Sequence, residues 1–142
     1  MRLDLYQAET ERQAERQATI LEQARALLNS GRQLTLLEES GILHALQVLI
    51  ENAIGKAKQW LKASGRAVPV SAYDAFAALA EAGMIPAEDL NTWNALVGLR
   101  NRIVHDYMNI DLARLHGLIQ RGEFRFVVDF LMRKPPNTSP HP

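Results

Sequence analysis

The sequence contains no cysteine. Disulfide bonds, thiolate nucleophiles and zinc sites built on cysteine are therefore excluded, and the composition suits a reducing cytoplasm. An excess of either charge is also missing, because 16 basic residues balance 16 acidic ones. A protein that binds nucleic acid chiefly through bulk charge usually carries a basic excess. Any contact with RNA or DNA must therefore come from a local site.

Long apolar runs are absent as well, and no stretch approaches the roughly 20 residues that a membrane span needs. The first residues, MRLDLYQAETERQAERQAT, are charged and lack the apolar core of a secretory signal. We therefore expect a cytoplasmic protein that makes no membrane contact. The sequence also lacks Gly-rich phosphate loops, internal repeats and low-complexity segments.

The composition is that of a folded domain. Hydrophobic residues make up 47% of the chain and charged residues 23%, as in ordinary globular proteins. A length of 142 residues suits one domain with a hydrophobic core. We expect a single domain over residues 1–134 and a disordered tail over residues 135–142.

The apolar pattern is helical throughout. Apolar residues recur at steps of three and four, and no stretch alternates with period two. Helices are expected over about 3–29, 34–63, 72–82, 86–107 and 112–133, the last with a break near Gly122. These elements predict an all-α fold, an antiparallel bundle of four to five helices.

Local signals mark the helix ends. Gly31 is expected to end the first helix, and Ser71 with Asp74 to form a capping box at the start of the third. Asn109 is a plausible C-terminal cap for the fourth helix, and Asp111 an N-cap for the helix that follows.

Two helices leave alternatives open. The first half of the 3–29 helix, QAETERQAERQ, is mostly polar and is interpreted as a solvated extension or as an arm that contacts a partner. The 34–63 helix has an apolar arc too broad for one stripe. Either it is the long central helix of a monomeric bundle, or one of its faces packs against a second subunit.

One stretch, RNRIVHDY at residues 100–107, places polar groups in an apolar face. Steps of three and four put Arg100 on the same side as Trp93 and Val104, and a helix that continues returns Tyr107 to that side. An unpaired buried guanidinium costs several kcal/mol. Arg100 must therefore reach a carboxylate, a carbonyl, a ligand phosphate or an open cleft.

His105 lies about 140° from Arg100 around a helix axis, so the two side chains diverge within one helix. Asn101 can share the side of His105. The arginine and histidine could cooperate across a two-fold axis. Alternatively, Arg100 reaches an acid at the edge of the core, and His105 is an ordinary surface or interface histidine.

Other sites have weaker support. His105 and Asp106 are neighbours that point apart, and adding Asp111 or His116 to them requires an assumed geometry, so no metal site is predicted. The strand–turn–helix nucleophile elbow of a serine hydrolase is missing.

The remaining histidines and tryptophans are expected to have structural roles. His44 is interpreted as a packed or interface residue, and His141 lies in the expected tail. Trp60 and Trp93 are expected in the core and not as platforms for stacked bases.

RNRIVHDY resembles the R-x4-H-x-Y signature of the HepT-like toxins, a branch of the HEPN superfamily. The segment ALQVLIENAIGKAKQWL resembles the long second helix of that family. The segment PVSAYDAFAALAEAGMIPAEDLNTWNALVGLRNRIVHDYMNID resembles the stretch from its short third helix through the motif. The similarity extends over residues 20–130. It implies a helical bundle that forms a two-fold homodimer with the motif helices near the axis.

The resemblance also implies an activity, that of a metal-independent endoribonuclease toxin without a cofactor. Arg100 and His105 would be catalytic and Asn101 supporting. Tyr107 would be modified by adenylylation (AMPylation) by a companion nucleotidyltransferase antitoxin of the MntA type. Because some HEPN proteins only support a nucleotidyltransferase, a non-catalytic binding module is the alternative.

The residue types suit metal-free RNA cleavage. Such cleavage uses the 2′-OH as nucleophile and leaves a 2′,3′-cyclic phosphate. Histidine, with a pKa of about 6.5, can accept and donate protons near neutrality. Arginine holds a phosphate through two hydrogen bonds and stabilises charge that develops on it.

Overall fold

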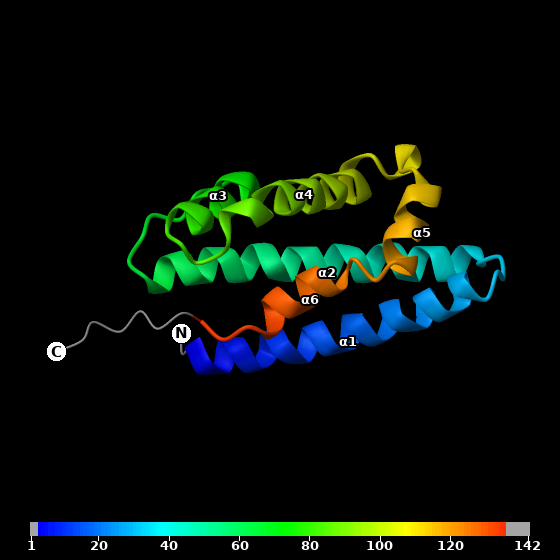
Figure 1. The fold of residues 1–142 in the computed structure, drawn as a ribbon, viewed down its shortest axis with the longest axis horizontal. Helices are drawn as coiled ribbons and strands as arrows, with labels where there is room; N and C mark the ends of the chain where they lie inside the picture. Colours follow the sequence, from blue (N-terminus) through cyan, green and yellow to red (C-terminus); the bar gives the residue numbers. More distant parts are fainter. Residues whose placement is uncertain (1–2, 136–142) are drawn as a thin grey trace.

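The computed structural model describes residues 3–135, and these residues are helical without a strand (Figure 1). The α-helices are α1 (Leu3–Asn29), α2 (Leu36–Ala63), α3 (Ala72–Glu81), α4 (Leu90–His105), α5 (Leu112–Gln120) and α6 (Arg125–Met132). Short 3-10 helices, η1 (Ala87–Asp89) and η2 (Tyr107–Asn109), precede and follow α4. The all-α prediction is confirmed. Of the expected tail, residues 136–142 lie outside the described part, and so does His141.

The two long helices form the frame of the bundle. α1 and α2 run antiparallel along its whole length, and α3 and α4 follow one another along the other side of α2 (Figure 1). α6 packs on both α1 and α2, while α5 lies at the end of the bundle where α4 stops. α2 is therefore the central helix, and it holds α4 in place. No helix in this described part combines the length and the apolarity that a membrane crossing requires.

Several helix ends follow their local signals. The Ser71 hydroxyl accepts a hydrogen bond from the Asp74 N–H, and the Asp111 carboxylate accepts one from the Arg114 N–H. The expected break between residues 112 and 133 separates α5 from α6 at Gly122, whose φ of +72° favours glycine.

The fourth helix is shorter than the sequence predicted. It ends at His105, and Asp106 leaves the helix with φ −147° and ψ 40°. The Asn109 side chain then donates a hydrogen bond of 2.7 Å to the Asp106 carboxylate and stabilises the η2 turn. Tyr107 belongs to this turn. The prediction that helix periodicity returns Tyr107 to the side of Arg100 is therefore wrong.

The broad apolar arc of α2 is buried within the chain itself. Helices α1, α3, α4 and α6 all pack on α2. The arc residues are all 9% exposed or less: Ile42, Leu43, Ala45, Leu46, Leu49, Ile50, Ala53, Ile54, Ala57, Trp60 and Leu61. The interpretation as the central helix of a monomeric bundle accounts for the arc. The arc therefore gives no argument for a second subunit, and the homodimer stays a prediction.

The polar half of α1 packs into the bundle. Gln7, Thr10 and Gln17 are each 7% exposed or less, in line with the fully buried Ala14. The Gln7 amide donates a hydrogen bond of 3.0 Å to the carbonyl of Leu131 in α6. The interpretation as a solvated extension is therefore wrong. The buried side of α1 packs against the chain itself, so it is not available as an arm that contacts a partner.

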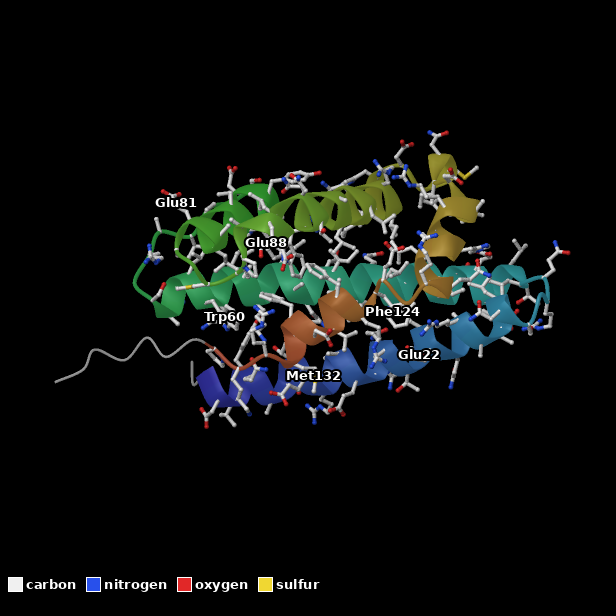
Figure 2. All side chains as sticks on the ribbon, viewed as in Figure 1. Glu22, Trp60, Glu81, Glu88, Phe124 and Met132 are labelled. Carbon is white, nitrogen blue, oxygen red and sulfur yellow. The ribbon has the colours of Figure 1, made fainter. Side chains whose placement is uncertain are left out.

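An aromatic cluster fixes the first half of α4. The Trp93 ring stacks on Phe76 of α3 at 4.3 Å between centroids and meets the edge of Phe130 of α6 at 4.9 Å. Trp60 is labelled on α2 in Figure 2, and its ring centroid lies 5.2 Å from that of the same Phe130. Both tryptophans are core residues, as predicted. Such ring pairs each contribute about 0.5–1.5 kcal/mol beyond the area that they bury.

Lys56 on α2 is fully buried and caps the end of α6. Its ammonium donates hydrogen bonds to the carbonyls of Phe130 at 2.8 Å, Leu131 at 2.9 Å and Arg133. These carbonyls lie at the C-terminal end of α6, where the regular helical hydrogen bonds run out. The Phe130 carbonyl also accepts the Arg133 N–H, and the Leu131 carbonyl also accepts the Gln7 amide. Burial, with the positive charge of Arg133 nearby, lowers the pKa of Lys56 to about 7.

Candidate functional site

Arg100 lies on the side of α4 that faces α2. Its Nη1 atom is 3.7 Å from Oε2 of Glu51, and the side chain is 24% exposed. Its Nε atom is buried and has no hydrogen-bond partner in the described part of the chain. The sequence required Arg100 to reach a carboxylate, a ligand or a cleft, and the carboxylate is present. The pair is loose, however, because 3.7 Å exceeds a hydrogen-bond distance.

The surroundings of Glu51 are polar and hollowed. Glu51 lines a cavity of about 170 Å³ between α1 and α2, together with Tyr6, Thr10, Asn52 and Gly55. The Nδ2 atom of Asn52 is buried without a hydrogen-bond partner among the described residues. Arg100 itself does not line this cavity, but its carboxylate partner Glu51 does.

His105 is the last residue of α4, and its side chain is exposed. It diverges from Arg100 by about 140° around the helix axis. Neither a hydrogen bond nor an ion pair joins the two residues in the described part of the chain. Asn101 is half-buried and shares the side of His105. A single copy of the chain thus keeps the arginine and the histidine apart.

Tyr107 lies in the η2 turn and is 58% exposed, so its phenol is open to a modifying enzyme. Apolar side chains near it are exposed too, with Val104 at 43%, Met108 at 82% and Leu112 at 41%. The end of α4 therefore combines a titratable imidazole, a phenol and uncovered apolar surface.

His44 and His116, the other histidines in the described part of the chain, have different surroundings. His44 is exposed on α2, so the expectation of a packed residue is wrong, and its interface role stays a prediction. His116 of α5 places its Nε2 atom 2.5 Å from Oε1 of Glu39 on α2 and thereby ties α5 to the bundle. Among residues 3–135, no three His, Asp or Glu side chains gather into a group that could hold a metal ion.

One feature was missed from the sequence. A cavity of about 490 Å³ lies between α4 and α5, and Arg102 and Arg114 are among its lining residues. Arg102 follows Arg100 by two positions and so occupies another side of α4. The sequence shows an arginine in each of the two helical segments, Arg102 and Arg114. That both line one cavity depends on how the chain turns after His105.

The fold is a small helical bundle. The polar residues of the 100–107 motif lie in the second half of α4 and in the η2 turn that follows it. The family model described as "Ribonuclease HepT-like" matches residues 14–133. The chain belongs to this family of HepT-like ribonucleases, as the resemblance of its motif segments indicated.

Solved structures share the fold. A structure described as a tri-AMPylated Shewanella oneidensis HEPN toxin in complex with an MNT antitoxin aligns with a TM-score of 0.76 and 22% identity. The alignment covers 89% of this chain and 96% of that one. A second, described as a toxin–antitoxin with AMP-PNP, aligns with a TM-score of 0.74 and 20% identity, over 89% of this chain and 97% of the other. A search of curated proteins found no match.

Proposed function

We propose that the protein is the toxin of a toxin–antitoxin pair, a metal-independent endoribonuclease that cleaves cellular RNA in the cytoplasm. The observation that carries the proposal is Arg100, a partly exposed guanidinium with a loose carboxylate partner and a buried, unpaired Nε. It stands in the R-x4-H-x-Y pattern at residues 100–107 of a chain from a ribonuclease family. A guanidinium with unused donors is suited to bind a phosphate.

In this reaction His105 accepts the proton of the ribose 2′-OH, and the 2′ oxygen attacks the adjacent phosphorus. The bond from phosphorus to the 5′ oxygen breaks, that oxygen takes up a proton, and a 2′,3′-cyclic phosphate remains. Arg100 stabilises the charge that builds on the phosphate oxygens. Asn101, on the side of His105, supports the imidazole.

Because Arg100 and His105 diverge within one chain, we propose that a two-fold homodimer completes the site. Each copy would present its α4 to the other, so that Arg100 of one copy meets His105 of its partner. A dimer also supplies two imidazoles, so one can act as the base while the other protonates the leaving oxygen.

We further propose that a neighbouring nucleotidyltransferase of the MntA type silences the toxin at Tyr107. The structure described as a tri-AMPylated HEPN toxin with an MNT antitoxin supports this proposal, and so does the exposure of the Tyr107 phenol. The phenol oxygen would attack the α-phosphorus of ATP, lose its proton and release pyrophosphate. Each AMP adds a negative phosphodiester near a site that must receive RNA phosphate.

Growth after induction of the gene alone tests this proposal. A toxin should arrest growth, and Arg100→Ala or His105→Ala should abolish the arrest. Arg16→Ala, which removes an exposed arginine from α1, should leave it intact. Co-expression of the neighbouring nucleotidyltransferase should restore growth. Normal growth with the natural chain produced as folded protein would instead favour the non-catalytic binding module.

A further inference from the structure

The cavity between α4 and α5 has an apolar floor. Its volume is about 490 Å³, within the usual range of ligand pockets of roughly 300–1,000 Å³. The floor is formed by aliphatic side chains from both helices and from the turn between them: Ala95, Leu96, Leu99, Ile110, Leu115 and Leu118. A flat ring can bury apolar surface against this floor.

Some of the charged side chains around this floor are paired and others are not. Glu123 is bound by Arg121, through hydrogen-bond contacts of 2.6 and 2.7 Å. The Asp111 carboxylate accepts the Arg114 N–H as the cap of α5. Arg102 and the Arg114 side chain have neither an ion pair nor a side-chain hydrogen bond to any residue between 3 and 135. Two guanidinium groups are therefore free to bind an anion.

We propose that this cavity is a binding site for a nucleoside monophosphate unit, a role that rests on the proposed function. The nucleobase would occupy the apolar floor, and Arg102 and Arg114 would bind the phosphate. An apolar slot next to unpaired arginines matches the two halves of a nucleotide. It does not match an uncharged aliphatic ligand, for which the arginines would have no use.

Two sources can supply this unit, substrate RNA and AMP attached to Tyr107. His105 follows Arg102 by three positions, so their side chains are neighbours on α4, and an RNA strand held at Arg102 would pass His105. Tyr107 precedes Asn109, Ile110 and Asp111, which form one wall of the cavity. AMP attached to Tyr107 would therefore start two residues from this wall. Because α4 ends at His105, the tyrosine is not confined to the side of Arg100.

Direct binding to the purified full-length chain tests the site. The probes are fluorescently labelled AMP and a 2′-O-methyl RNA hexamer, which cannot be cleaved. Arg102→Gln with Arg114→Gln should weaken binding of at least one probe by about tenfold, the effect of a lost charge-assisted contact. Ala95→Trp, which fills the cavity from an exposed position, should do the same. Arg16→Gln on α1 is the matched control. Unchanged binding of both probes in all variants would overturn the proposal.

Magnetisation transfer in solution separates the two sources. Transfer from base protons of the hexamer to the methyl groups of Leu99 and Leu118 would assign the site to substrate RNA. Transfer from adenine protons of Tyr107-linked AMP to the same methyls would assign it to the modification. Transfer in neither sample would overturn the proposal. If the protein cleaves no RNA and accepts no AMP, the proposed function fails, while the binding of free AMP and hexamer still decides whether the cavity holds a nucleotide.

Discussion

Arg100 of α4 and Glu51 of α2 face one another with Nη1 and Oε2 3.7 Å apart. At this distance the carboxylate attracts the guanidinium without a hydrogen bond. Under the proposed function, an RNA phosphate that binds Arg100 would compete with this carboxylate.

The first prediction concerns this competition. Glu51→Gln should lower the KM for RNA by about two- to fivefold, because it removes a negative charge beside the phosphate site, and partly exposed pairs of this kind are worth about 1 kcal/mol or less. The effect should shrink as salt rises. Initial cleavage rates at two ionic strengths measure it, with the exposed Glu88→Gln on η1 as control. A higher KM in Glu51→Gln would mean that the carboxylate serves mainly to position Arg100.

The second prediction concerns a site shared between two copies. Light scattering should give about twice the mass of one chain at micromolar concentration. Arg100→Ala and His105→Ala should each lose about 100-fold or more in cleavage rate while keeping the helical content. Mixing the two variants should restore at most about a quarter of the natural activity, since half the dimers would be mixed and each would hold one Arg100–His105 pair without the second imidazole. A monomer with full activity would contradict the shared site.

The third prediction concerns Tyr107. Tyr107→Phe should keep the toxicity of the natural chain but escape the nucleotidyltransferase, because it lacks the hydroxyl that accepts AMP. Mass spectrometry of the natural chain, co-expressed with that enzyme, should show adenylate increments on the peptide that contains Tyr107. Tyr73→Phe on α3, a tyrosine that is 40% exposed, is the control. If Tyr107→Phe is neutralised as well as the natural chain, the antitoxin acts by another route.

The fourth prediction concerns stability and pH. Lys56→Met should lower the free energy of unfolding by about 2 kcal/mol, because three carbonyls at the end of α6 each lose the hydrogen bond from the ammonium. Lys62→Met, an exposed change on the same helix, should have little effect. Urea unfolding near pH 7 compares the three proteins. A loss under 0.5 kcal/mol, an estimate of the effect of an ordinary surface change, would show that water satisfies these carbonyls.

The pH dependence has a definite sign. The folded pKa of Lys56, about 7, lies below its ordinary value of 10.5. Between these two values the unfolded chain binds more protons, so the free energy of unfolding should rise with pH, by up to about 1.4 kcal/mol per unit. Glu11 raises this pKa and Arg133 lowers it. Lys56→Met should remove the rise seen in urea unfolding between pH 7 and 9.

Much of the fold could be predicted because helix periodicity and helix caps are determined by short stretches of sequence. Ser71, Asp111 and Gly122 act within a few residues of their own positions, and each does what its residue type favours. The burial of Trp60 and Trp93 followed from their place in apolar stripes.

The predictions that failed concern a contact between distant segments and a turn that competes with a helix. Gln7 is buried because it meets the carbonyl of Leu131, 124 residues away, and nothing local in the sequence indicates that contact. α4 stops at His105 because Asp106 and Asn109 form a turn that competes with the helix. An Asp and an Asn three apart were a turn signal that the helical pattern outweighed.

The residues proposed for the candidate site stay a prediction from the sequence, which does not give their geometry. The spacing of Arg100 and His105 already required them to diverge. The identity of the carboxylate near Arg100 depended on the packing of α4 against α2, which brings Glu51 close. The α4–α5 cavity depended on the path of the chain after Asp106, and no pattern in the sequence describes that path.

Cleavage of RNA by the purified, unmodified chain in excess EDTA, followed by analysis of the product ends, tests whether the protein is a metal-independent endoribonuclease. We expect cleavage with 2′,3′-cyclic phosphate and 5′-hydroxyl ends, lost in Arg100→Ala and in His105→Ala and retained in Arg16→Ala. Intact RNA in the presence of folded natural protein, or equal cleavage by His105→Ala, would contradict this expectation.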